Sequence, residues 1–131
     1  MGATQLRLVS PLGLQANPEY YPGAIITDDM HAGLEGADVI MMLRIQRERI
    51  KEKTNLMTDH EYRKQYGLTK DSLKLARADA IVMHPGPMNR DVEISGDVAD
   101  GPQSVITQQV TNGLAVRMAI LAAISDGKTQ R

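Results

Sequence analysis

The sequence predicts an α/β fold in which a parallel sheet is flanked by helices. Short apolar segments alternate with segments that carry helix caps, and strands connected through helices pair in parallel with right-handed crossovers. Residues 37–43 contain the clearest strand, a continuous apolar run bounded by polar residues, which is typical of a strand buried on both faces. Residues 104–124 have the length and periodicity of a long helix.

Turn and capping residues set the expected bounds of the elements. Pro11 closes the first strand, Asp28 and Asp29 are suited to cap a short helix, and Gly36 stops that helix. A loop or a single helical turn is expected between the first two strands, and an irregular path over residues 92–94 and 97–101. The expected strands are residues 5–10, 24–27, 37–43 and 80–83, and the expected helices are residues 28–35, 61–67, 71–76 and 104–124.

The composition limits the possible functions without identifying one. At 131 residues and 42% hydrophobic content, the chain is expected to form one domain with a substantial core. Its net charge of −1 provides no general field for nucleic acid or an anionic membrane surface. The absence of cysteine excludes a disulfide framework, a thiolate zinc site and a thiol nucleophile. Because Phe and Trp are absent, the core must be aliphatic, and no aromatic platform for stacking bases is expected.

The expected location is the cytoplasm, because the first residues lack the basic and apolar regions of a signal peptide. No apolar run approaches membrane-spanning length, since Arg117 interrupts the longest one. No metal site is expected, because neither Asp28 with Asp29 nor Asp97 with Asp100 has the spacing of a calcium loop.

A proline-rich turn follows the strand expected at residues 80–83, where residues 83–90 read Met-His-Pro-Gly-Pro-Met-Asn-Arg. Pro85 and Pro87 cannot continue a helix or a central strand and have no N–H, so the turn is poor in donors. The carbonyls of Pro85 and Gly86 are therefore free to accept hydrogen bonds from a ligand that carries an NH2 group. The Gly86–Pro87 bond is a candidate for the cis form. A plain strand-to-loop turn stays open as the alternative.

A second polar stretch follows the strand of residues 37–43. Arg44, Gln46 and Arg49 place two guanidinium groups and an amide where the sheet opens, and guanidinium binds carboxylate or phosphate through two parallel hydrogen bonds. A small acidic molecule fits this chemistry. For the charged run as a whole a solvated loop is the favoured alternative, whereas Arg44 emerges directly from an apolar strand and favours a site.

The last helix has more apolar surface than one domain of this size can cover. Its first half is amphipathic, with Ile106, Val110 and Leu114 on one side. Its second half, residues 114–124, is apolar nearly all round. Residues 104–126 are therefore expected to pack on a missing domain or on another protomer.

Four stretches, taken together and in order, closely resemble aspartate carbamoyltransferase: residues 43–49, 83–90, 99–104 and 108–113. The resemblance corresponds to most of that enzyme's carboxyl-terminal, aspartate-binding domain, so residues 1–131 are expected to form a single, partial domain. It implies a Rossmann-like parallel sheet without the first strand of the domain. The amino-terminal carbamoyl-phosphate domain, with its Ser-Thr-Arg-Thr loop, has no counterpart here. The ornithine-specific family has a Cys in the proline loop and a Ser-Met-Gly motif, and this sequence has neither.

The resemblance implies transfer of the carbamoyl group from carbamoyl phosphate to the amino group of L-aspartate, on the route to pyrimidines. Arg44 would hold a carboxylate of L-aspartate, with Gln46 beside it and Arg49 on the same loop. The reaction needs no metal and no cofactor, and the donors that stabilise the oxyanion belong to the missing domain. No catalytic residue is assigned within this chain, which is expected to be inactive alone.

For carbamoyl phosphate, the resemblance implies that the carbonyls of Pro85 and Gly86 accept from its NH2 group and that Pro87 fixes their direction. These carbonyls and Arg44 must then face a common crevice. His84 is a candidate general base by residue type, but hydrogen bonding within its own loop is favoured, so its expected role is loop support. Asp91 stands where the family usually carries Gly, and Asp tolerates the left-handed backbone that Gly would adopt.

The expected partners follow from the same resemblance. The family works as trimers with active sites shared between subunits, which implies a homo-oligomer and leaves regulatory or dihydroorotase-like chains open. A non-catalytic binding or interaction subunit that assembles through the last helix is the alternative from another class. A nucleotide-binding half of a doubly wound fold is disfavoured, because no Gly-x-Gly-x-x-Gly sequence follows any strand.

Overall fold

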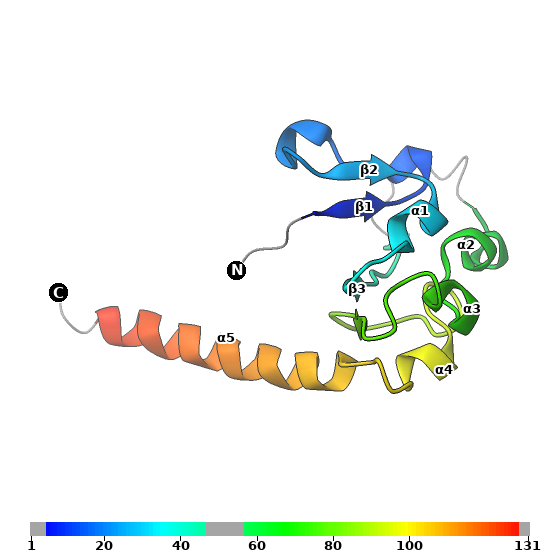
Figure 1. The fold of residues 1–131 in the computed structure, drawn as a ribbon. Coiled ribbons are helices and arrows are strands. Elements are labelled where there is room, and N and C mark those ends of the chain that lie inside the picture. The colour runs from blue at the N-terminus through cyan, green and yellow to red at the C-terminus, as the bar shows by residue number, and fades with distance from the viewer. Residues whose placement is uncertain (1–4, 47–56, 129–131) are drawn as a thin grey trace.

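The computed structural model describes residues 5–46 and 57–128, and the chain follows the alternation of strands and helices that the sequence predicts (Figure 1). Two 3-10 turns lie between the first two strands, as expected for that segment. The elements in order are β1 (Arg7–Val9), η1 (Leu12–Leu14), η2 (Pro18–Tyr20), β2 (Ile25–Thr27), α1 (Met30–Leu34), β3 (Val39–Met41), α2 (Asp59–Tyr66), α3 (Lys70–Leu73), β4 (Ile81–Met83), α4 (Gly96–Ala99) and α5 (Ile106–Lys128).

The four strands form two separate parallel pairs. β1 pairs with β2 in a register that sets Arg7 opposite Ile25, and β3 pairs with β4 in a register that sets Met41 opposite Met83. Parallel pairing through helical crossovers is confirmed, but the expected single sheet is present as two two-stranded ladders in the described residues. The strands are shorter than predicted, because an apolar run extends beyond the residues that find a ladder partner.

A groove of about 360 Å³ separates the two ladders. Residues of β1 and β3 line it, together with side chains from α1 and α2 such as Leu34 and Tyr62. In a parallel ladder, alternate residues bond to the neighbouring strand and those between point away. Because Ser10 N–H donates to Thr27 and Met42 N–H donates to Met83, the N–H groups of Val9 and Val39 point away from their ladders. The facing edges of the two pairs are thus unpaired among the described residues.

The core lies under the β3–β4 ladder and is closed by α2 and the segment after the proline turn. Leu68, Val82 and Ile94 are fully buried, and an isolated parallel bridge joins Leu68 to Ile94. The rings of Tyr62 and Tyr66, one turn apart on α2, stack at 5.3 Å between centroids. The core is otherwise aliphatic, as the composition predicts, and includes Met30, Leu34, Ile40, Met42, Val98, Ala99 and Ile106.

Side-chain caps fix where the short helices begin. Asp29 accepts from the N–H groups of His31 and Ala32 and caps α1, as predicted for the Asp28–Asp29 pair. Thr58 and Glu61 form a capping box, so α2 begins at residue 59, two residues before the predicted start. Thr69 and Ser72 form the corresponding box on α3.

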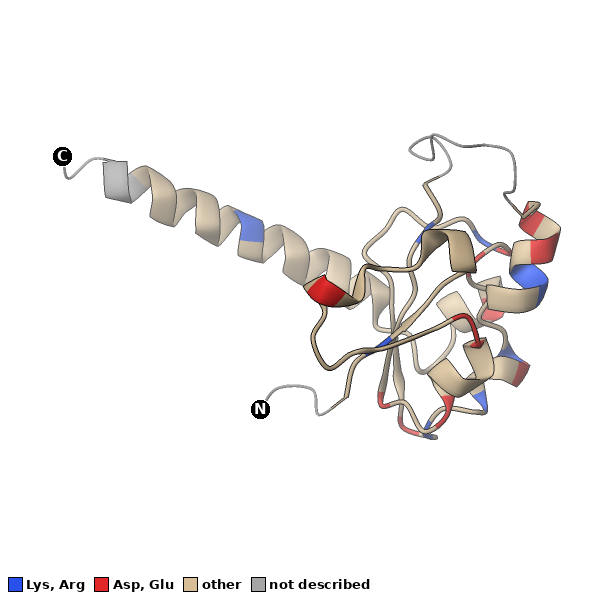
Figure 2. Ribbon diagram, turned by 90° about the horizontal axis from the view of Figure 1, so that it is seen from above, with Lys and Arg blue, Asp and Glu red and all other residues tan. Residues whose placement is uncertain are grey.

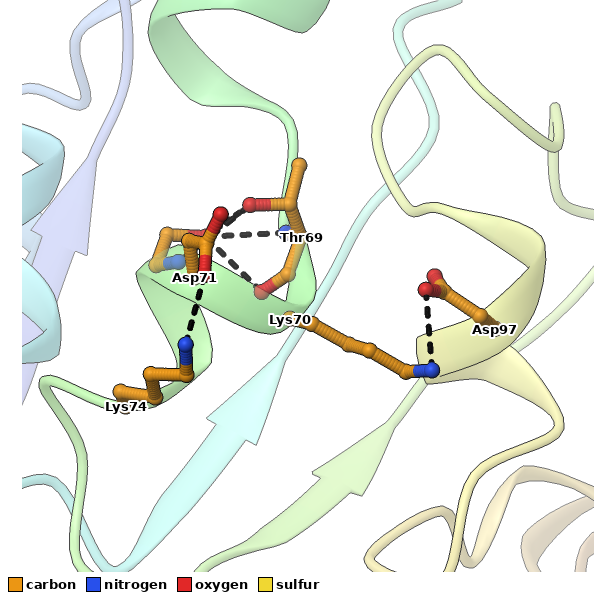
Figure 3. A network of polar contacts seen from close by, with 6 residues as sticks. Thr69, Lys70, Asp71, Lys74 and Asp97 are labelled. Atoms are coloured by element: carbon orange, nitrogen blue, oxygen red, sulfur yellow. Dashed lines mark hydrogen bonds and ion pairs between the residues drawn. The ribbon is translucent and has the colours of Figure 1, made fainter.

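The prediction of an irregular path over residues 97–101 is wrong in part, because Gly96–Ala99 form the short helix α4. Burial of Val98 and Ala99 against the core stabilises this turn despite the helix-disfavouring Gly96. Figure 3 shows Lys70 of α3 reaching Asp97 of α4, with 3.3 Å between Nζ and Oδ2. The capping network of α3, including the Asp71–Lys74 contact at 2.7 Å, lies beside this link.

Helix α5 extends away from the rest of the domain (Figures 1 and 2). Only its first turns contact the β3–β4 ladder, and Figure 2 shows the remainder with few charged residues. Among the described helices, α5 included, none is long and apolar enough to cross a membrane. Its exposed apolar side chains, here called the apolar face of α5, are Val110, Leu114, Val116, Met118, Ile120, Leu121 and Ile124.

Amide hydrogen exchange tests the two open edges. We expect Leu8 and Ile40, whose N–H groups point into their ladders, to exchange more slowly than Val9 and Val39, whose N–H groups point away. The measurement is residue-resolved exchange by NMR on the chain. Equal protection of Val9 and Leu8 would show that the edge facing the groove is hydrogen-bonded.

Acid should weaken the fold. The Arg90 guanidinium bonds Asp100 through both oxygens and lowers the pKa of that carboxyl from 3.8, and Lys74 lowers the pKa of Asp71 in the same way. A lowered pKa stabilises the fold above the unfolded pKa, and this contribution is lost as pH falls through the lower folded value. We expect the urea midpoint to be level down to about pH 5 and to fall below about pH 4. Asp100→Asn should show a smaller fall, and an unchanged acid response would contradict this assignment.

Candidate functional site

Two polar segments leave the same edge of the β3–β4 ladder. The strands run parallel with Met41 opposite Met83, and Met42 N–H donates to the Met83 carbonyl at 2.9 Å. Residues 42–46 and 84–87 therefore leave the ladder at the same level. The carboxyl edge of a parallel sheet, between neighbouring strands, is where open α/β folds bind ligands. The Arg44 segment and the proline turn, the two stretches in which the sequence analysis expects ligand contacts, therefore start beside each other.

The proline turn presents its carbonyls to the outside. Pro85, Gly86 and Pro87 are exposed, and the Gly86–Pro87 bond, a candidate for the cis form from the sequence, is cis. Gly86 has a φ of 68°, a left-handed conformation that is readily open to glycine. The carbonyls of Pro85 and Gly86 accept no hydrogen bond from the residues that the structure describes. Both carbonyl oxygens can therefore accept a hydrogen bond from a ligand.

His84 supports this turn from inside, which confirms the predicted hydrogen bonding within its own loop. Its side chain is buried at 1% exposure. The ring Nδ1 accepts from the N–H of Gly86 at 2.9 Å, and Nε2 lies 3.2 Å from Oε1 of Glu93. Because Nδ1 is an acceptor, the neutral ring carries its proton on Nε2 and donates it to Glu93.

Glu93 is the site residue that the sequence analysis missed. It is fully buried, and its Oε1 accepts from His84 Nε2 and, at 2.6 Å, from the N–H of Asn89. Its Oε2 has no hydrogen-bond partner within residues 5–46 and 57–128. Burial, with the nearby Glu93 carboxylate as the next cause, raises the pKa of Tyr62 to about 12. The available signal in the sequence was a single acid between Val92 and Ile94, in a segment predicted to be irregular.

Gln109 ties the first turns of α5 to both strand ends. Its Oε1 accepts from the N–H of His84 at 2.9 Å, and its Nε2 lies 3.8 Å from Sδ of Met41. The backbone reinforces this position, because Val82 bonds to Gln103 and Val105 on the side of β4 away from β3. Helix α5 thereby starts beside the edge from which the polar segments leave.

Ion pairs hold the far end of the turn. Asp91 has a φ of 63°, the left-handed conformation that was anticipated for a Gly position, and its Oδ1 lies 3.2 Å from Arg63 of α2. Arg90 forms a two-armed contact with Asp100 after α4, at 2.6 and 2.9 Å. The turn is therefore anchored to two separate elements beyond its own strand.

The predicted aspartate-binding residues are only partly described. Arg44 and Gln46 are half-buried and lie three and five residues beyond the end of β3. Arg49 lies outside the described residues. Within residues 5–46 and 57–128, no cluster of three or more His, Asp or Glu side chains is placed to hold a metal ion.

The comparison with protein families gives the class. Residues 1–124 match the family described as "Aspartate/ornithine carbamoyltransferase, Asp/Orn binding domain", and the chain belongs to this family. Curated relatives with high similarity to this chain are named "Aspartate carbamoyltransferase catalytic subunit". That of Syntrophotalea carbinolica is 60% identical over 106 residues, which are 81% of this chain and 34% of the relative. That of Mesorhizobium japonicum is 51% identical over 122 residues, 93% of this chain and 37% of the relative. The chain thus spans between a third and two fifths of the length of these two relatives.

Solved structures agree in fold. The aspartate transcarbamoylase of Trypanosoma cruzi, in complex with carbamoyl phosphate, aligns with a TM-score of 0.70 and 28% identity over 88% of this chain and 38% of that chain. The ornithine carbamoyltransferase of Thermus thermophilus aligns with a TM-score of 0.73 over 89% of this chain and 38% of that chain. At 21% identity, this second similarity shows the fold alone.

Gln109 offers a test of the site's internal support. We expect Gln109→Leu to destabilise the chain by about 1 kcal/mol, because it leaves the half-buried His84 N–H without an acceptor. Gln109→Glu keeps an acceptor and should cost less. The measurement is urea denaturation of the three chains at neutral pH. A destabilisation by Leu no larger than that by Glu would contradict a structural role for this hydrogen bond.

Proposed function

We propose that this chain supplies the aspartate-binding half of an aspartate carbamoyltransferase active site. The enzyme transfers the carbamoyl group of carbamoyl phosphate to the amino group of L-aspartate and forms N-carbamoyl-L-aspartate and phosphate. The observation that carries the proposal is the β3–β4 register, because it starts the Arg44 segment and the proline turn at one edge. The names of the curated relatives support the choice of aspartate over ornithine.

The proposed aspartate site uses side chains after β3. Arg44 binds a carboxylate of L-aspartate through two parallel N–H···O bonds, with the Gln46 amide beside it and Arg49 on the same segment. Arg44 follows β3, whose Ile40 is buried, and Met42, the buried residue just after the strand, bonds to Met83, so the backbone of Arg44 starts from a rigid element. A guanidinium on such a base can select a planar carboxylate by geometry as well as charge.

The proposed carbamoyl-phosphate contact uses the turn after β4. The carbonyls of Pro85 and Gly86 accept hydrogen bonds from the NH2 group of carbamoyl phosphate, and Pro87 limits the directions that they can take. Their lack of partners among the described residues supports this role. The phosphate group requires donors from another part of the enzyme, since the turn itself is rich in acceptors.

Together with donors from the rest of the enzyme, the two contacts would place the reactants side by side. The neutral amino nitrogen of L-aspartate attacks the carbamoyl carbon, and a tetrahedral intermediate forms. The C–O bond to phosphate then breaks, and the proton that the nitrogen loses leaves with the phosphate. Holding two polar reactants together contributes much of the rate, and donors aimed at the developing oxyanion contribute the rest. This chain contributes position and recognition, whereas the oxyanion donors are expected on the carbamoyl-phosphate domain.

A second candidate function is a non-catalytic interaction subunit. The observation that favours it is the apolar face of α5, whose side chains are more than half exposed. Such a face is typical of a surface that is covered by another protein part. In either case we propose that α5 packs on the carbamoyl-phosphate domain or on another protomer. Assembly as a homo-oligomer and a cytoplasmic location stay predictions.

Calorimetry with L-aspartate tests the proposal, in the presence of the carbamoyl-phosphate domain of a catalytic subunit and with inorganic phosphate in place of carbamoyl phosphate, so that no carbamoyl group can be transferred. Arg44→Ala should weaken binding at least about tenfold, because it removes hydrogen bonds to a charged group. Arg44→Lys should recover only part of the affinity, since an ammonium cannot form the two-armed contact.

Arg77→Ala is the matched control, because Arg77 precedes β4 at the opposite end of the ladder and is exposed beside Asp38 and Asp79. It should bind L-aspartate as the unmodified chain does. Undiminished binding by Arg44→Ala would overturn the proposed aspartate site. Self-association without any ligand binding would favour the interaction subunit.

A further inference from the structure

The strongest unexplained feature of the site is the buried carboxylate of Glu93. It has no exposed surface, and among the residues that the structure describes Oε2 has no hydrogen-bond partner. Burying a carboxylate with one oxygen unsatisfied is more costly than burying an apolar side chain of the same size. Stabilisation of the fold therefore does not explain why a glutamate occupies this buried position.

The contacts of Glu93 lead to the proline turn. Oε1 accepts from two donors, the Nε2–H of His84 at the start of the turn and the N–H of Asn89 at its end. A single oxygen atom thus joins residues that are five apart in sequence and closes the turn between them. The 2.6 Å distance to Asn89 is typical of a short, charge-assisted hydrogen bond.

The carboxylate also selects the tautomer of His84. A carboxylate can only accept, so the ring nitrogen that faces it, Nε2, must carry the proton. The other nitrogen, Nδ1, is then a bare acceptor, and it takes the N–H of Gly86 at 2.9 Å. With the proton on Nδ1 instead, two donors would face each other at this position.

The Gly86 N–H belongs to the same peptide group as the Pro85 carbonyl. This peptide is trans, since the cis bond of the turn is the following one, Gly86–Pro87. In a planar trans peptide, N–H and C=O point in opposite directions. Holding the N–H on His84, inside the domain, therefore aims the Pro85 carbonyl outward, away from the core.

We propose that Glu93 is a positioning residue for the carbamoyl-phosphate contact, acting through the His84 ring on the direction of the Pro85 carbonyl. The sequence of contacts is Glu93 Oε1, His84 Nε2–H, His84 Nδ1, Gly86 N–H and the Pro85 carbonyl. Glu93 touches no substrate in this arrangement. The inference rests on the proposed function for its ligand, whereas the geometry of the chain of contacts is independent of it.

NMR on the chain itself tests the contacts. Long-range 1H–15N spectra distinguish a bare from a protonated ring nitrogen, and we expect His84 with a bare Nδ1. Glu93→Met removes the acceptor at similar length and should produce a mixture of tautomers and faster exchange of the Gly86 amide. Glu93→Gln keeps an oxygen acceptor and should largely retain both signals. Glu61→Gln, a change at the exposed cap of α2, should leave His84 and Gly86 unchanged.

Binding of carbamoyl phosphate tests the consequence, with the chain joined to the carbamoyl-phosphate domain. Glu93→Met should weaken binding about tenfold, which corresponds to one misdirected hydrogen bond. In a His84→Asn background, where the Asn oxygen can accept from Gly86 without Glu93, the further effect of Glu93→Met on carbamoyl-phosphate binding should vanish.

The two measurements separate the possible failures. An unchanged His84 tautomer in both Glu93 variants would overturn the role of Glu93, whatever happens to binding. An altered tautomer with unchanged affinity for carbamoyl phosphate would leave the contacts intact and overturn the proposed ligand of the turn. If Glu93→Met does not fold, Glu93→Leu, which also removes the acceptor, takes its place with and without His84→Asn, and additive effects on carbamoyl-phosphate binding in that comparison would contradict the proposal.

Discussion

Backbone pairing between β3 and β4 is the constraint on which the candidate site depends. Three pairs of opposed residues and the bond from Met42 to Met83 fix the level at which each strand ends. Because side-chain direction alternates along a strand, a slip of one residue would turn Ile40 and Val82 out of the core. Burial of the core thus protects the register, and the register sets the start of both polar segments.

Buried polar contacts then hold the proline turn in place after the end of β4. His84, Glu93 and Gln109 come from three parts of the chain and meet under the proline turn, where each satisfies a backbone N–H. Such a network is costly if one member is lost, since the remaining groups stay buried without partners. The same contacts hold the turn and leave the carbonyls of Pro85 and Gly86 facing outward, so the residues that stabilise the turn are also those on which its proposed recognition role depends.

Two surfaces of the chain are incomplete in a physical sense. In the part of the chain that the structure describes, the strand edges that border the groove between β1 and β3 have no ladder partners, and the apolar face of α5 is exposed to water. Both are unfavourable, the first through unsatisfied backbone groups and the second through hydrophobic hydration. They agree with a chain that spans about a third of its relatives' length and with a site that is proposed to need another domain.

Local patterns in the sequence determined the order of strands and helices, the Asp29 cap, the proline turn with its cis bond and the excess apolar surface of α5. These features depend on residues that are close in sequence, and the rules for turns, helix caps and hydrophobic periodicity describe such local effects. Only the tertiary structure decided that the strands form two ladders, that residues 96–99 are helical and that Glu93 lies buried against His84. Each of these depends on pairing or burial between residues distant in space or sequence, which no local pattern of residue types specifies.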